Sequence, residues 1–303
     1  MPTDPTPVFS GGVGRSGTTV VGRLLRKHPD LYGGSPNEIQ FITEGNGVID
    51  VVFGMRDFVE TQMSTTGRML VKLPMNKSMK FRFKNFRKRV LGDWWSRTNR
   101  LGKESGLHRS MDRATMESLL DQFESELAGD PVVAGRNFIM GFARHHVKFT
   151  GQSFWMDTTP ANMMYADYLY RLMPEARFIE MRRFPLDTIA SVIREPWGPD
   201  DPIAAVTWWR DRIALADAAA APIPTDQHLT LELEDLVVND RDRSYQRLLD
   251  VVGLSDHPKM RAYFDEEMNA DRAHIGRWQD GFDDPDAVLA EFERVVGPIE
   301  ARS

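Results

Sequence analysis

The sequence contains no cysteine among its 303 residues. Disulfide bonds, thiolate metal sites and thiol nucleophiles are therefore excluded. The chain also lacks any run of 18 apolar residues, so we expect no membrane span. Residues 1–7 (MPTDPTP) have neither the basic nor the apolar region of a signal peptide. These absences lead us to expect a cytoplasmic protein.

An excess of basic residues is also missing. The chain has 38 Lys and Arg against 44 Asp and Glu, a net charge of −6, which argues against a general nucleic-acid-binding protein. The apolar fraction of 41% and the charged fraction of 27% are ordinary for a folded globular chain. Because α/β enzymes often reach this length as one unit, we expect a single domain over residues 1–303.

One segment departs from this acidic balance. Residues 68–113 contain 14 Lys and Arg against three acids, a local charge of 14 − 3 = +11, which leaves −6 − 11 = −17 for the rest of the chain. Such asymmetry indicates an anionic partner for this segment. The alternative is a helical surface whose lysines face water, as charge runs often do.

Strand-like apolar runs alternate with segments of helical periodicity along most of the chain. The expected strands are 8–11, 153–156, 177–181 and 228–233, and the expected helices are 18–27, 111–127, 137–149, 161–173, 186–194, 203–221, 243–252 and 286–296. This alternation predicts an α/β fold with a parallel sheet flanked by helices. Ligands of such sheets bind beyond the carboxyl ends of the strands, where the motifs below all fall.

A glycine-rich stretch (GVGRSGTT, residues 12–19) follows the first expected strand. It fits the dinucleotide pattern G-x-G-x-x-G, and it nearly fits the nucleotide-triphosphatase loop, in which Thr18 would replace the lysine that reaches the phosphates. A third interpretation is a phosphate cradle with its cation earlier in the loop, since glycine N–H groups, hydroxyls and the N-terminus of a helix all attract anions. The candidate residues of this cradle are Gly14, Arg15, Ser16, Gly17, Thr18 and Thr19.

Residues 9–41 resemble the start of the sulfotransferases that use 3′-phosphoadenosine 5′-phosphosulfate (PAPS), above all bacterial members, tyrosylprotein sulfotransferases and heparan sulfate sulfotransferases. In that family a P-loop-type turn binds the 5′-phosphosulfate group. The resemblance therefore implies a P-loop-type parallel sheet, PAPS as sulfuryl donor, and Arg15 as the cation of the loop. Gly14 stands where many members have proline.

A second motif resembles the part of the family that binds the 3′-phosphate. Arg183, Pro185 and Ser191 match it in kind and spacing, whereas Phe184 replaces the usual aspartate. Independently of the resemblance, an arginine at a strand end can pair with a dianionic phosphate through parallel hydrogen bonds. The alternative is a surface arginine followed by a packed helical serine.

Two further stretches resemble the family more weakly. Gly276 and Arg277 lie in the stretch AHIGRW, which is similar to a segment that closes over the nucleotide in bacterial members. The stretch WMDTTP is similar to a family segment whose lysine reaches the site, but Thr158 stands at that position. Either Arg15 carries more of the charge stabilisation, or a basic residue from positions 72–89 reaches in.

The candidate general base is Glu38, in the stretch PNEIQF. This stretch resembles that of the heparan sulfate enzymes, whose glutamate is the base. Like-charge repulsion from a bound phosphosulfate should raise the pKa of this carboxyl, with Arg15 as an offset, and a base works best near neutrality. The competing candidates are His145 and His146, since cytosolic small-molecule sulfotransferases use a histidine. Glu38 as a surface or capping residue is the structural alternative.

The sequence thus predicts transfer of a sulfuryl group from PAPS to an acceptor hydroxyl, with no metal ion. The acceptor would be a carbohydrate, a glycolipid or another small molecule, bound by a mostly helical basic insertion at residues 43–150. Trp94 and Trp95 are candidates for stacking on rings or for the core, and the insertion is also a candidate for peripheral contact with a membrane surface. The alternatives are a P-loop nucleotide kinase or NTPase, and a non-catalytic nucleotide-binding module.

Overall fold

A computed structural model describes residues 4–34, 36–54, 78–98, 102, 104–146 and 148–299. The first part of the predicted basic segment, including Lys72 and Lys77, lies outside these residues.

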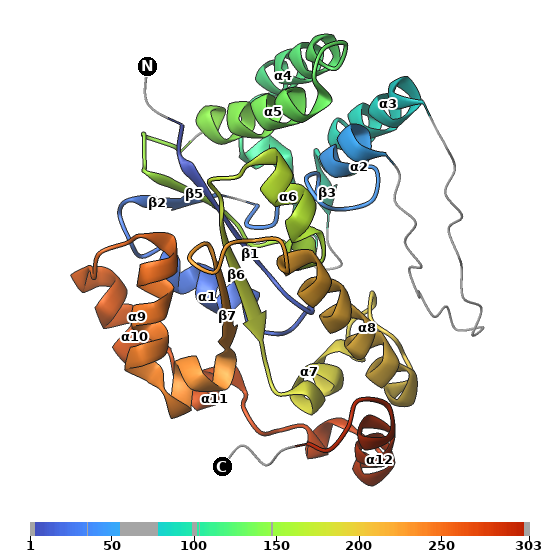
Figure 1. Ribbon diagram of the computed structural model, residues 1–303, viewed down its shortest axis with the longest axis vertical. Helices are drawn as coiled ribbons and strands as arrows, with labels where there is room; N and C mark the ends of the chain where they lie inside the picture. Colours follow the sequence, from blue (N-terminus) through green and yellow to red (C-terminus); the bar gives the residue numbers. More distant parts are fainter. Residues whose placement is uncertain are drawn as a thin grey trace.

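A central sheet of five parallel strands organises the molecule (Figure 1). The strand order is β2-β5-β1-β6-β7. The strands are β1 (Thr6–Gly11), β2 (Leu31–Gly33), β5 (Phe154–Asp157), β6 (Arg177–Arg182) and β7 (His228–Glu232). The expected α/β fold with a parallel sheet is confirmed, and the short edge strand β2 is an addition that its three residues gave too little pattern to predict.

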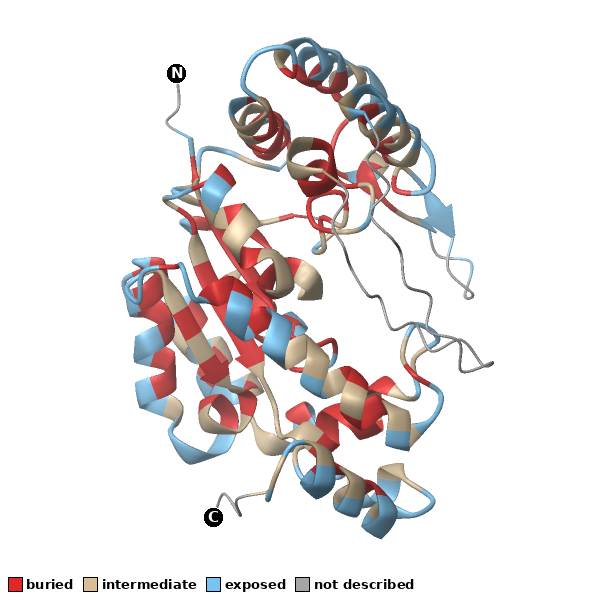
Figure 2. Cartoon of the chain, turned by 45° about the vertical axis from the view of Figure 1, so that its right-hand side comes forward, coloured by how far each residue is buried: buried red, intermediate tan, exposed pale blue. Residues whose placement is uncertain are grey.

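Helices cover both faces of the sheet, as a parallel sheet requires. Successive side chains of a strand point to opposite faces, so Val8 joins the core beneath α1, α9 and α10, whereas Phe9 joins the core beneath α5, α6 and α8. Figure 2 shows the strands buried and the outer helix faces exposed. The helices of these two layers are α1 (Thr18–Leu25), α5 (Pro131–His145), α6 (Ala166–Leu172), α8 (Pro202–Ala220), α9 (Arg241–Val252) and α10 (Pro258–Glu267).

In the described part of the segment between β2 and β5, helices predominate and pack onto the α5 side of the sheet (Figure 1). Its elements are α2 (Val48–Phe53), α3 (Met79–Val90), the hairpin of β3 (Arg97–Thr98) and β4 (Glu104–Ser105), a 3₁₀ turn (Leu107–Arg109), α4 (Arg113–Glu126) and α5. Phe41, Phe86 and Phe138 pack edge to face, and this aromatic group belongs to the same core as Phe9 of β1. The insertion therefore shares one continuous hydrophobic core with the sheet.

The remaining elements lie toward the C-terminus or around β5 and β6. They are α7 (Pro185–Val192), α11 (Ala270–Ala273), α12 (Pro285–Val295), two 3₁₀ segments (Pro160–Tyr165 and Gln279–Gly281) and a π-helical turn (Asp235–Asn239). The helix expected over 161–173 is thus a 3₁₀ segment followed by α6. The helix expected from 137 begins at Pro131, because the Asp130 side chain accepts from the N–H groups of Val132 and Val133.

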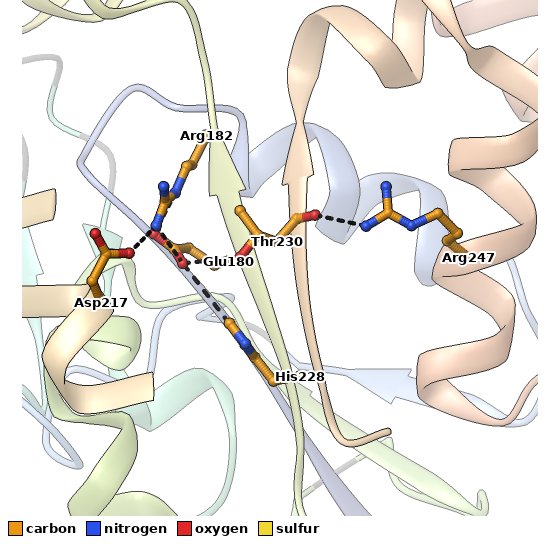
Figure 3. Close-up of polar contacts among 6 residues, drawn as sticks. All are labelled: Glu180, Arg182, Asp217, His228, Thr230 and Arg247. Atoms are coloured by element: carbon orange, nitrogen blue, oxygen red, sulfur yellow. Dashed lines mark hydrogen bonds and ion pairs between the residues drawn. The ribbon is translucent and has the colours of Figure 1, made fainter. Parts of the chain in front are cut away.

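A buried ionic cluster fixes the β6–β7 edge of the sheet (Figure 3). The Glu180 carboxylate, only 1% exposed, accepts two hydrogen bonds from Arg182 at 2.9 and 3.1 Å and one from the Thr230 hydroxyl at 3.3 Å. Arg182 also pairs with Asp217 of α8. His228 lies 3.8 Å from Glu180, and burial lowers the pKa of its imidazole. The cluster thereby holds the carboxyl end of β6 in place.

No helix in the described part of the chain combines the length and the apolar character needed to span a bilayer.

Candidate nucleotide-binding and catalytic site

The glycine-rich stretch forms the turn from β1 into α1. Gly12 and Gly17 have φ values of 147° and 103°, and Arg15 has a φ of 73°, so the turn uses left-handed backbone that favours glycine. A Cβ at Gly12 would overlap with the Met181 carbonyl of β6. Gly17 caps α1, no side chain caps this end, and the first turn has no acidic residue. The N-terminus of α1 therefore keeps its positive dipole end for an anion.

The hydroxyl groups of this turn differ in their environment. Ser16 is 2% exposed, and its Oγ has no hydrogen-bond partner among the described residues. Thr18 is buried and Thr19 is exposed. A buried hydroxyl without a partner is costly unless a ligand satisfies it, so Ser16 fits an oxygen of a bound phosphate.

The two predicted anion motifs meet at the carboxyl ends of β1 and β6. Arg15 Nε donates to Ser191 Oγ at 3.0 Å, and Arg183 Nη1 lies 3.5 Å from the carbonyl oxygen of Arg15. Arg15 also pairs with Glu195 at 3.4 Å, while 49% of its side chain remains exposed. Such an exposed pair is weak, so a phosphate can replace it. The structure therefore brings Arg15, Arg183 and Ser191 into one basic cluster.

Arg183 is the buried member of this cluster. Its side chain is 9% exposed, its Nη2 donates to the His274 carbonyl at 2.6 Å, and its Nε has no partner among the described residues. Burial lowers the pKa of this guanidinium, with Asp187, 3.6 Å away, as an opposing influence. A buried cation with an unused donor is suited to an anionic ligand.

Asp187 ties the C-terminal candidates to the same place. Its carboxylate accepts from the backbone N–H of Gly276 at 2.7 Å and of Arg277 at 2.9 Å. The Arg277 side chain is 54% exposed, 3.6 Å from Asp271. The backbone of both residues thus lies against the β6–α7 turn.

The turn after β6 is held at Phe184 by a carboxylate from elsewhere in the chain. The Phe184 N–H donates to the Glu234 carboxylate at 2.9 Å. Glu234 follows β7, and burial raises the pKa of its carboxyl. A carboxylate from another strand therefore satisfies the turn at this position.

Trp197 is a site residue that the sequence analysis missed. The far edge of its indole overlaps the place that a Cβ of Gly14 would take, so a larger residue at position 14 would require the indole to move. Trp197 is 49% exposed and packs against Trp208 at a ring separation of 6.3 Å. No local pattern links Trp197 to Gly14, because they come from different segments.

Glu38 lies beside the carboxyl end of β5. The N–H of Ile39 donates to the fully buried Asp157 at 2.8 Å, and Thr158 donates to the Asn37 carbonyl from both its N–H and its hydroxyl. These bonds fix the backbone on both sides of Glu38. Burial, followed by the charge of Asp157, raises the pKa of Glu38 to about 7. Its carboxyl is therefore poised for proton transfer near neutral pH.

A cation from the insertion lies near this carboxyl. Arg97 of β3 donates to Gln40 Oε1 at 2.9 Å, and its charge opposes the rise in the pKa of Glu38. Arg82 and Arg89, in contrast, bond to backbone carbonyls of the α2 region. Neither Arg82 nor Arg89 therefore takes the place of the lysine that the resembled family has at the position of Thr158.

The other aromatic and histidine candidates occupy structural positions. His146 is 3% exposed and bonds to the Tyr32 hydroxyl, and His145 bonds to the Gly141 carbonyl at 2.8 Å. Trp94 is 5% exposed and belongs to the core, so it is not a stacking platform. Trp95 is partly buried, with the Arg113 guanidinium 5.5 Å from its ring.

A cavity of about 540 Å³ adjoins Arg183 on the side of α8 and α12. Trp209 and Phe292 form apolar walls, and Asp187, Glu232 and Glu234 contribute carboxylates. These acids make the cavity less favourable for a phosphate than the cluster of Arg15 and Arg183. No group of three or more Asp, Glu or His suited to hold a metal ion occurs in the described ranges.

A parallel sheet with a glycine turn between β1 and α1, and with basic side chains at the carboxyl ends of its strands, defines a P-loop-type α/β protein. Comparison with known families narrows this class. A sequence model of the sulfotransferase family matches residues 7–258, and the chain belongs to this family.

Solved structures agree in fold. The sulfotransferase domain from the Synechococcus PCC 7002 olefin synthase is 17% identical, with 96% of this chain and 94% of that chain covered and a TM-score of 0.52. The sulfotransferase domain from the curacin biosynthetic pathway is 16% identical, with coverages of 96% and 95% and a TM-score of 0.53. Comparison with curated protein sequences gives no match.

Proposed function

We propose that this sulfotransferase takes PAPS as donor and transfers its sulfuryl group to an acceptor hydroxyl, with Glu38 as general base. The observation that carries the proposal is the contact of Arg15 with both Ser191 and Arg183. Residues from two motifs that are distant in the sequence thereby form one basic cluster. PAPS has phosphate groups at both its 3′ and its 5′ position, and a donor of this kind needs positive charge within reach of both groups.

The proposed donor position follows from the charges. The turn of Gly14–Thr19, with the N-terminus of α1 and the Ser16 hydroxyl, would hold the 5′-phosphosulfate. Arg183 and Ser191 would hold the 3′-phosphate, and the backbone of Gly276 and Arg277 would close over it. The unused Nε of Arg183 supports this assignment.

The proposed chemistry needs no redox partner. The acceptor oxygen attacks sulfur and forms a new O–S bond while its proton passes to the Glu38 carboxylate. The bond between sulfur and the bridging oxygen breaks in line, and the electron pair stays on the 5′-phosphate of the departing 3′,5′-bisphosphate. Arg15 and the turn would stabilise that charge, and loss of one such donor costs roughly 2.7–4 kcal/mol of transition-state stabilisation.

Three competing interpretations are less well supported. Both histidines of α5 and its end are engaged in structural hydrogen bonds, which favours Glu38 as the base. A nucleotide kinase or NTPase would need a lysine where Thr18 stands. A non-catalytic nucleotide-binding module is disfavoured by the carboxyl of Glu38, whose pKa of about 7 at the carboxyl end of β5 suits proton transfer.

Arg183→Ala tests the donor assignment by calorimetry with adenosine 3′,5′-bisphosphate and with AMP, which lacks the 3′-phosphate. We expect binding of the bisphosphate to fall by about 10- to 150-fold, the equivalent of one charge-assisted bond, and AMP binding to change little. Arg177→Ala, at the other end of β6, is the matched control. Equal losses for both nucleotides would contradict the assignment, and ATP- and Mg²⁺-dependent turnover without PAPS turnover would favour the kinase.

A further inference from the structure

Helix α3 carries six basic residues and no acidic one among its 12 residues. Three of the six form hydrogen bonds or ion pairs with other residues of the chain. Arg82 donates to the Val51 carbonyl, Arg87 pairs with Asp121 at 2.6 Å, and Arg89 bonds to the Gly45 carbonyl while its guanidinium covers Trp94. The other three basic residues are lysines, and they need a separate explanation.

Lys80, Lys84 and Lys88 form a single exposed row, which we call the lysine row. They stand four residues apart, so they lie on one face of α3 over about 12 Å. None of them has an ion pair with any residue that the structure describes. Like charges at this spacing repel and destabilise a helix, so the row is unfavourable unless an anion faces it.

The surface beside the lysine row is amphipathic. A groove of about 360 Å³ lies along α3, with Phe83 and Leu91 as its apolar part and Lys80, Lys84 and Lys88 among its cations. Phe81, on the same side of α3, is 41% exposed. Among the described residues, Glu124 of α4 is the one acid that lines the groove, so the lysines there outnumber the acid. Figure 1 shows α3 at the periphery, away from β6 and β7.

The chemistry of this surface separates two kinds of anionic partner. A glycan is gripped by exposed aromatic faces and by planar arginine forks. Here Trp94 is buried, Trp95 has Arg113 near its ring, and the three arginines of α3 are already engaged. Lysines are flexible, hydrated point charges, and they can reach acidic lipid headgroups. Apolar side chains between them can contact the acyl chains below those headgroups.

We propose that the lysine row docks the protein reversibly onto a membrane surface rich in anionic lipid. Each lysine near such a surface contributes to the free energy of binding by electrostatic attraction alone. The proposal therefore does not depend on PAPS as donor or on Glu38 as general base. Three lysines account for about a 100-fold gain in partition onto acidic vesicles. High salt should remove the binding, because exposed charges are screened within about 10 Å at 0.1 M salt.

Cosedimentation of the full chain with vesicles tests the proposal. The probes are vesicles of phosphatidylcholine with phosphatidylserine and vesicles of phosphatidylcholine alone. We expect binding only to the first, and about a 100-fold loss in the variant Lys80→Gln/Lys84→Gln/Lys88→Gln. The matched control Lys27→Gln/Lys148→Gln/Lys259→Gln removes the same charge from exposed positions elsewhere and should keep most of the binding.

A variant that should increase vesicle binding distinguishes an electrostatic effect from a loss of folding. Glu124→Gln should strengthen vesicle binding by about fivefold, because it removes the acid that faces the row. Equal binding of the two triple variants, or no binding of the unaltered protein to acidic vesicles, would overturn the proposal. Binding to heparin that depends on the lysine row, without binding to vesicles, would overturn it in favour of a sulfated glycan. Bisphosphate binding should be the same in all variants, which separates this result from the donor assignment.

Discussion

At the scale of single residues, the carboxyl group of Glu38 shows how position sets chemistry. Burial is the main cause that raises its pKa to about 7, Asp157 and Glu44 add to the rise, and Arg97 opposes it. The sequence suggested a different cause, repulsion by bound phosphosulfate. The protein itself already produces the shift, because the bonds of Ile39 and Thr158 dock this segment against the end of β5.

The pH dependence of turnover follows from this pKa. A general base works when deprotonated, so we expect kcat/KM for PAPS to rise about tenfold per pH unit at acid pH and to level off above about pH 7. Glu38→Gln should lower turnover by about 10²- to 10⁴-fold and leave bisphosphate binding intact. Release of the bisphosphate from PAPS, measured across pH, checks both expectations. Unchanged turnover in Glu38→Gln would exclude this residue as the base.

Two neighbouring substitutions serve as controls of opposite sign. Arg97→Gln removes a charge that lowers the pKa of Glu38, so the acid limb should move to higher pH. Glu44→Gln removes a charge that raises this pKa, so the limb should move to lower pH. Shifts in the same direction would mean that the limb belongs to another group.

At the scale of elements, the turn between β1 and α1 depends on a residue far along the chain. The Trp197 indole fills the space beside Gly14, and Gly12 approaches the backbone of Met181. The glycines that make the turn recognisable therefore also serve close packing. A proline or alanine at Gly14 would require the indole to move.

Gly14→Ala tests this contact. We expect bisphosphate binding to weaken by about tenfold or more, because overpacking typically costs 1–3 kcal/mol and the turn must shift. Adding Trp197→Ala should restore binding by removing the overlap. Gly45→Ala, where a Cβ meets nothing within 4 Å, is the control and should be silent. Titration of each variant with the bisphosphate measures the effect, and failure of the double variant to recover would show that the indole is not the obstacle.

At the scale of the whole molecule, Asp187 connects segments that are distant in sequence. It contacts Arg183 and accepts from Gly276 and Arg277, so it joins α7 to the segment after α11. On the proposed function, this connection would hold the segment in place over the nucleotide. The hydrophobic core beneath the insertion likewise continues to β1. The same core therefore supports the segment of Glu38 and the strand that leads to Arg15.

Asp187→Asn should loosen this connection. We expect the bisphosphate to bind roughly tenfold more weakly, since two charge-assisted hydrogen bonds lose their charge. The rise in melting temperature on adding the bisphosphate should shrink accordingly. Asp284→Asn, at the exposed N-cap of α12, should alter the melting temperature of the free protein only. An unchanged ligand-induced rise in Asp187→Asn would show that the segment holds itself in place.

Much of the fold could be predicted from the sequence, and less of the site. The alternation of strands and helices follows from apolar periodicity, which every local segment carries. The turn at Gly14–Thr19 and the motif of Arg183 and Ser191 were visible because their residues are close together in the chain. The strand β2 and the helices α2, α3 and α10 were missed, because β2 and α2 are short, α3 is strongly basic, and α10 buries only Met260 and Phe264.

The sequence by itself determined the class of fold, the family resemblance and the two anion motifs, because each depends on local spacing and residue type. Only the tertiary structure decided that Arg15 reaches Ser191, that Trp197 lies over Gly14, that Glu234 serves the turn at Phe184 and that Arg97 lies near Glu38. Those contacts join residues from different strands and loops. Their distances depend on strand order and on packing, which no stretch of sequence contains.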